Sequence, residues 1–219
     1  PLARVIVWEI DPAHCIVQFT ISHIIADRSS LTMLISSLWN IYNDLMASSP
    51  IVKNGNPTFL QSLSTNTTST KNAYLENLNQ LTISDYIPLD FSRSEKFDFN
   101  GDWVEGNTSG ILYKEIKQYS RQNKTRPYVF FAAILSSLLY KLSSYKDITV
   151  ASAISTRSLK YMQSFGPFVN TMLLRQVLND GMESYSNLLA STHDTIQQAI
   201  DNSGTSFSSL ISQLRKERN

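Results

Sequence analysis

Charge of either sign is scarce in this chain of 219 residues. Charged side chains make up 17% of the sequence, and the formal net charge is +1. A chain so close to neutral lacks the basic surface by which proteins bind nucleic acid or an anionic membrane. No apolar run approaches the roughly 18 residues that a transmembrane helix needs. We therefore expect neither nucleic acid nor a membrane as a partner.

Cysteine and histidine are nearly absent as well. Cys15 is the only cysteine, which excludes an internal disulfide and argues against a cysteine-based metal site. A lone thiol is typical of a reducing compartment, so we expect a cytoplasmic protein. The three histidines, His14, His23 and His193, are too far apart in sequence to suggest zinc, and we expect no metal. A glycine-rich phosphate loop and a Gly-X-Ser-X-Gly motif are also missing.

What is present is the patterning of an ordinary globular chain. Alternating apolar residues over 4–10 and 15–21, joined by a turn at Asp11-Pro12, predict an antiparallel pair of strands. Apolar residues at helical spacing then predict a helix from a cap at Ser29 or Ser30 to about Ala47.

The rest of the chain is rich in predicted helices. Two irregular stretches, 51–70 and 86–110, separate the elements, and we interpret the second as a crossing between two lobes. Helices are predicted over 71–81, 110–122, 127–142, 182–200 and 206–218, and strands over 147–154 and 168–177. The apolar residues of 127–142 predict a deeply buried helix. The order favours an α/β (α+β) fold with mixed sheets covered by helices.

One stretch carries possible chemistry. His23 and Asp27 lie four residues apart, directly after the second strand and directly before the first helix. A strand end holds a side chain rigidly, and an imidazole there is a candidate general base near neutral pH. A lone histidine is more often structural, however, and a His-X-X-X-Asp spacing arises often by chance.

The residues around this spacing, together with several later segments, resemble a known family. Ser22 to Ser30 resembles the His-His-X-X-X-Asp-Gly motif of the condensation domains of non-ribosomal peptide synthetases. Further segments that resemble the family follow in the expected order: 74–78 with 87–93, 125–128, 147–157 and 166–175. The last of these, Gly-Pro-Phe-Val-Asn-Thr-Met-Leu-Leu-Arg, is the most specific.

The resemblance implies a fold. Condensation domains have two lobes like chloramphenicol acetyltransferase, set in a V around a channel, and are about twice as long as this chain. We therefore expect the central portion of such a domain. Residues 1–87 would belong to the N-lobe, 88–110 to the crossing and 111–219 to the C-lobe.

The resemblance also implies a reaction. An amine on one carrier-bound substrate attacks the thioester of another, and an amide forms. The substrates arrive on phosphopantetheine arms of upstream and downstream carrier proteins, beside neighbouring synthetase domains, with no cofactor bound to the domain itself. His23 corresponds to the catalytic histidine. Asp27 corresponds to a structural aspartate that pairs with an arginine, which the sequence does not identify.

Other positions follow from the same resemblance. Asn170 corresponds to an asparagine near the channel, and Arg157 and Arg175 to structural arginines. Two positions depart from the motif: Ser22 replaces its first histidine and Arg28 replaces its glycine. These changes keep open a second hypothesis, a catalytically silent domain that docks carrier proteins or accessory enzymes. Ester formation on the same scaffold is a third.

Overall fold

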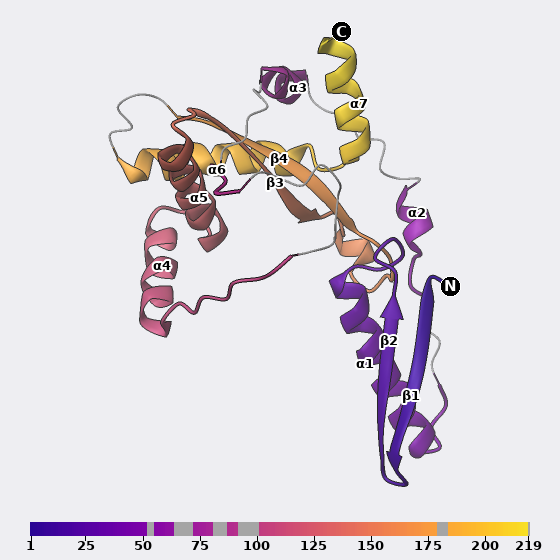
Figure 1. Ribbon diagram of the computed structural model, residues 1–219. Coiled ribbons are helices and arrows are strands. Elements are labelled where there is room, and N and C mark those ends of the chain that lie inside the picture. The colour runs from indigo at the N-terminus through magenta and orange to yellow at the C-terminus, as the bar shows by residue number, and fades with distance from the viewer. Residues whose placement is uncertain (52–54, 64–71, 81–86, 92–100, 179–183, 219) are drawn as a thin grey trace. The chain divides into compact units, whose positions relative to one another are not determined.

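The computed structural model describes residues 1–51, 55–63, 72–80, 87–91, 101–178 and 184–218 (Figure 1). These residues form two compact units. Unit 1 consists of residues 1–69, 153–171 and 203–207, and unit 2 of 70–152, 172–202 and 208–219. Both units therefore join segments that are distant in sequence. The predicted lobe boundaries remain a prediction.

Unit 1 begins with the predicted hairpin. Strands β1 (Ala3–Asp11) and β2 (His14–Ile21) pair antiparallel, with Ala3 opposite Ile21. The Asp11 carboxylate accepts a hydrogen bond from the Ala13 N–H at 2.8 Å, which closes the turn. The sequence prediction of two strands and their pairing is confirmed.

Helix α1 (Arg28–Met46) follows the hairpin, and it starts earlier than predicted. Its N-cap is Asp27 rather than Ser29 or Ser30, because the Asp27 backbone is extended and its carboxylate accepts from the Ser30 N–H. The unit also contains the short helix α2 (Phe59–Leu63) and a 3₁₀ turn, Leu159–Tyr161. The prediction that 51–70 is entirely irregular was therefore wrong, because α2 lies within it.

Unit 2 is mainly helical. Its helices are α3 (Asn72–Asn79), α4 (Gly110–Gln122), α5 (Pro127–Ser143), α6 (Tyr185–Asp201) and most of α7 (Phe207–Arg218). Strands β3 (Asp147–Ser155) and β4 (Val169–Val177) form a second two-stranded sheet, and the boundary between the units falls within both strands. Predicted element ends at 71, 81 and 182, and part of the 87–93 segment, lie outside the described residues.

Helix α5 is less buried than its composition suggests. Val129, Ala133 and Leu139 are buried, but Phe131 and Leu138 remain 45% and 50% exposed. The helix is apolar on every side, whereas α4 and α6, the helices that contact it most, cover only part of its surface. The prediction that residues 127–142 form a deeply buried helix was therefore wrong. No helix among the described residues has the length and apolarity that crossing a bilayer requires.

Candidate functional site

The loop that carries His23 is the six-residue link between β2 and α1. Its first residue is anchored to the hairpin, since the Ser22 N–H donates to the carbonyl of Leu2 at 2.8 Å. A tight turn follows, with the Ile25 N–H bonded to the Ser22 carbonyl at 3.1 Å. The His23 side chain is exposed, and no described residue forms a hydrogen bond with its ring. The imidazole is therefore exposed among the described residues.

The far end of the loop is held by Asp27. Its carboxylate caps α1 by accepting from the Ser30 N–H at 2.7 Å. Both carboxylate oxygens also accept from Arg157 Nη2, at 3.0 and 2.9 Å. The two side chains are each only 4% exposed, so this is a buried ion pair. Arg157 is thus the partner that the sequence analysis expected for Asp27 but could not identify.

Ser30 adds a second connection at the same place. Its buried hydroxyl accepts from the Gly166 N–H at 3.0 Å and donates to the Gly166 carbonyl at 2.8 Å. The same oxygen lies 3.2 Å from Arg157 Nη2 and accepts from it. One side chain therefore joins the first turn of α1 to the backbone that precedes β4.

Further contacts hold Arg157 through Nη1 and through the face of its guanidinium group, whereas its buried Nε has no hydrogen-bond partner among the described residues. Its Nη1 donates to the carbonyls of Tyr161 (3.1 Å) and Ser164, and its guanidinium carbon lies 4.2 Å from the centre of the Phe168 ring. A planar guanidinium suits such a site because it can bond in the plane and stack on an aromatic face. The arginine is therefore held as firmly as the carboxylate that it binds.

Gly166 leaves no room for a side chain. A Cβ atom there would lie 2.5 Å from the Cβ of Phe59, whose ring packs edge-on against Phe168. Glycine is required at this position because the backbone and the Phe59 side chain approach so closely.

Two opposing effects set the pKa of Asp27. Burial by itself would raise it, but the Ser30 hydrogen bonds and the Arg157 guanidinium outweigh burial and hold the pKa below its usual value. Asp27 is thus ionised at neutral pH and stays paired. It acts on the loop as a fixed anchor.

The two departures from the motif lie at the two ends of the loop. Ser22 is half-buried, and its backbone makes the contact to β1. Arg28 is the first residue of α1, and its side chain is exposed. The buried contacts of Asp27 and Ser30 are formed with both substitutions in place.

Asn170 and Arg175 have structural contacts. The Asn170 amide donates to the carbonyls of Ser203 and Thr205 at 2.8 and 2.7 Å, and its oxygen accepts from the Phe207 N–H. It therefore fixes the loop before α7. That Asn170 lies near a channel stays a prediction.

Arg175 belongs to a different network, in unit 2. Its Nε and Nη2 bond both oxygens of Asp147 at 2.9 Å, and its Nη1 reaches the backbone and side-chain oxygens of Asn77. Tyr74 donates to the Leu173 carbonyl at 2.9 Å in the same region. Arg175 thus connects α3 to the strands, which agrees with a structural role.

Sequence reasoning missed Ser30 and Gly166 as members of the site. They are 136 residues apart, and no local pattern links them. The available sequence signals were a serine in the first turn of a predicted amphipathic helix and a glycine at the start of the family-like segment 166–175. No group of three or more metal-binding side chains occurs in the part of the chain that the structure describes.

The condensation-domain sequence profile matches residues 1–219, and the chain belongs to this family. Bacitracin synthase 3 of Bacillus licheniformis is 25% identical over 225 residues, covering 100% of this chain and 4% of that protein. The chain thus spans a small part of this curated relative.

Solved structures show the same fold. A four-domain nonribosomal peptide synthetase bound to AMP and glycine matches with a TM-score of 0.80 at 19% identity, over 98% of this chain and 17% of that one. The epimerization domain from the third module of tyrocidine synthetase B matches with a TM-score of 0.78 at 13% identity, over 96% of this chain and 50% of that one. The expected fold class is confirmed, and the fold by itself does not fix the reaction.

Proposed function

We propose that the protein containing this chain is an acyltransferase that forms an amide bond between two substrates held as thioesters on carrier proteins. The acceptor amine attacks the donor thioester carbonyl, a C–N bond forms, and the C–S bond breaks. The donor carrier's thiol leaves with a proton, and the lengthened chain remains on the acceptor carrier. Upstream and downstream carriers, presented by neighbouring synthetase domains, would be the partners.

His23 is the residue that we assign to the reacting centre. Its imidazole could take the proton of the attacking amine or stabilise charge on the tetrahedral intermediate, and its position would also orient the amine. Asp27 is too firmly engaged with Arg157 and Ser30 to exchange protons with a substrate. We therefore assign it a positioning role.

The observation that carries the proposal is the pairing of an exposed His23 with a buried anchor four residues later. The exposed imidazole favours a catalytic role, whereas the anchor would stabilise the loop in a catalytic and in a silent domain alike. Arg28 is the observation that favours the silent alternative, because a long cationic side chain replaces the motif's glycine beside the loop. Membership of the family supports both, so an activity measurement has to separate them.

The test follows acyl transfer between two loaded carrier proteins by intact-protein mass spectrometry, with the complete parent protein. We expect wild type to transfer the acyl group and H23A to lose at least about 100-fold in rate, the usual contribution of a positioned acid–base group. H14A is the matched control, because His14 is also exposed and is the first residue of β2, where it contacts Asp11. Its rate should equal that of wild type.

Other outcomes would contradict the assignment. Full transfer by H23A would exclude a catalytic role for His23. Carrier binding without transfer, by wild type and H23A alike and with several acyl donors, would favour the silent docking domain. Transfer to a hydroxyl acceptor but not to an amine would establish ester formation instead.

A further inference from the structure

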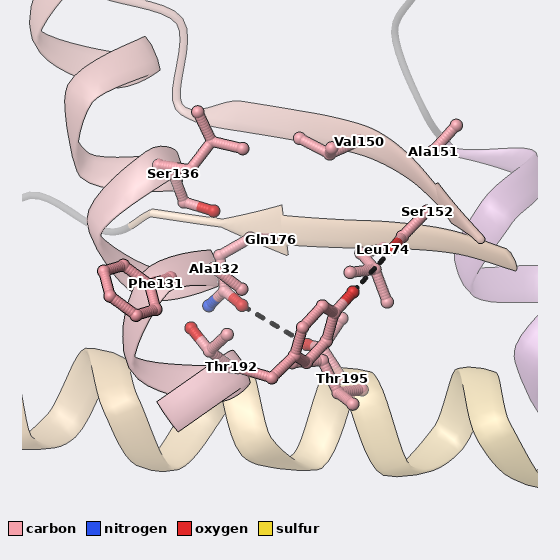
Figure 2. Close-up of a pocket in the computed structure, with 13 residues that line it drawn as sticks. Phe131, Ala132, Ser136, Val150, Ala151, Ser152, Leu174, Gln176, Thr192 and Thr195 are labelled. Atoms are coloured by element: carbon pink, nitrogen blue, oxygen red, sulfur yellow. Dashed lines mark hydrogen bonds between the residues drawn. The ribbon is translucent and has the colours of Figure 1, made fainter. Parts of the chain in front are cut away.

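Unit 2 contains a cavity that the proposed reaction does not use. It has a volume of about 260 Å³ and lies where α5, the β3–β4 strands and α6 meet (Figure 2). Elsewhere these elements pack closely, with Ala133 of α5, Ile148 of β3 and Leu189 of α6 all fully buried. The gap is therefore local. Two of the residues that line it, Ala132 and Ala151, have side chains too small to fill it.

The walls of the cavity are apolar with a cluster of neutral polar groups at one side. Phe131, Leu135, Val150 and Leu174 supply apolar surface. Figure 2 shows Thr192 of α6 and Gln176 of β4 converging below Ala132 of α5. No charged side chain lines the cavity, and all of its lining residues belong to the part of the chain that the structure describes. An ionised ligand would therefore have no partner there.

Two of the polar groups constrain what can bind. The Thr192 hydroxyl is buried, in a residue only 3% exposed, and it has no hydrogen-bond partner in the described structure. The Gln176 amide bonds Ser191 at 2.7 Å and Thr195 at 3.3 Å, which holds it in place at the cavity wall. Leaving a buried hydroxyl without a hydrogen-bond partner is unfavourable. A bound oxygen acceptor would provide that partner.

The size of the cavity sets the size of the ligand. A cavity of about 150 Å³ lined by apolar groups holds benzene, so 260 Å³ admits a single ring that carries a small substituent. We propose that this cavity binds a compact, neutral aromatic molecule with one carbonyl oxygen, the ring against Phe131 and Leu174 and the carbonyl accepting from Thr192. The site is independent of His23, which belongs to unit 1.

Benzamide and toluene are the probes, since they share a ring and differ in the carbonyl group. Saturation-transfer NMR and calorimetric titration on the complete protein should detect benzamide binding to wild type. T192V keeps the shape of the side chain and removes its hydroxyl, so it should weaken benzamide about tenfold. T192S should restore the affinity. T20V, the same exchange on the exposed β2 strand, is the matched control and should change nothing.

Two further measurements locate the site. A132F fills the cavity and should abolish the binding of both probes, whereas H23A should leave benzamide affinity unchanged. Equal benzamide affinity in wild type and T192V would overturn the proposed hydrogen bond. Absence of benzamide binding to folded wild type would show that water alone occupies the cavity and would overturn the proposal. Loss of binding in H23A would place the probe at the catalytic loop instead.

Discussion

Among the residues that the structure describes, each unit has an arginine bonded to both oxygens of an aspartate, and the two pairs differ in their surroundings. Arg157 and Asp27 in unit 1 are both 4% exposed, whereas Arg175 and Asp147 in unit 2 are 9% and 20% exposed. The first pair lies beneath the loop that carries His23, and the second connects α3 to the strands. The chemistry is the same, but water can reach one pair far more easily than the other.

The difference indicates that the degree of burial determines how firmly an ion pair fixes the structure around it. The pair of unit 2 is also largely buried, but water reaches its aspartate more easily, so losing one partner should cost less there. A buried pair leaves an uncompensated charge when it is broken, which makes its geometry hard to change. We infer that the buried pair of unit 1 serves to fix the loop, while the pair of unit 2 is one of several contacts that hold a helix.

The largest expected effect is the removal of the buried carboxylate. D27A strands the Arg157 guanidinium and removes the cap of α1, and we expect it to destabilise the protein by about 3–5 kcal/mol. D147A is the matched change in unit 2 and should cost less, about 1–2 kcal/mol, since Asp147 is 20% exposed and Arg175 keeps its bonds to Asn77. Urea unfolding of the two variants against wild type measures both. Equal losses of unfolding free energy in D27A and D147A would contradict the proposed difference between the two pairs.

A smaller effect is expected where Gly166 faces Phe59. G166A places a methyl group against that side chain and should destabilise by about 1–3 kcal/mol through overpacking. F59A creates the missing space, so the double variant should lose less than the sum of the two single changes. Additive losses in the same unfolding experiment would show that the two residues do not constrain each other.

The smallest effect is the contribution of Asp27 to acid sensitivity. Because its pKa is lowered in the folded protein, its stabilisation is complete above the pKa of the unfolded chain, near 4. That stabilisation is lost as the pH falls from about 4 through the lower folded value. The unfolding free energy of D27N should therefore decline less between pH 4 and 2.5 than that of wild type. Parallel declines would mean that Asp27 titrates normally.

The sequence predicted the elements better than the contacts between them. The helix over 110–122 matches α4 at both ends, because Ser109 caps it and its apolar spacing is regular. The cap of α1 was misplaced because three residues within four positions, Asp27, Ser29 and Ser30, can all cap a helix. Helix α2 was missed because five residues are too few for a periodic pattern.

The site shows the same limit. His23 and Asp27 could be found because a local spacing marks them, and the family resemblance gave them roles. The contact of Arg157 with Asp27 spans 130 residues, and that of Ser30 with Gly166 spans 136, so neither leaves a pattern in any window of sequence. Such pairs become visible only when the chain is folded.

The most direct test of the central claim, that the buried Asp27–Arg157 pair fixes the loop carrying His23, is amide hydrogen exchange over residues 22–30. The comparison is between wild type, D27N and D147N, which change charge with little change in shape. We expect faster exchange of this segment in D27N, with D147N equal to wild type. Unchanged protection in D27N, or the same increase in D147N, would contradict the claim.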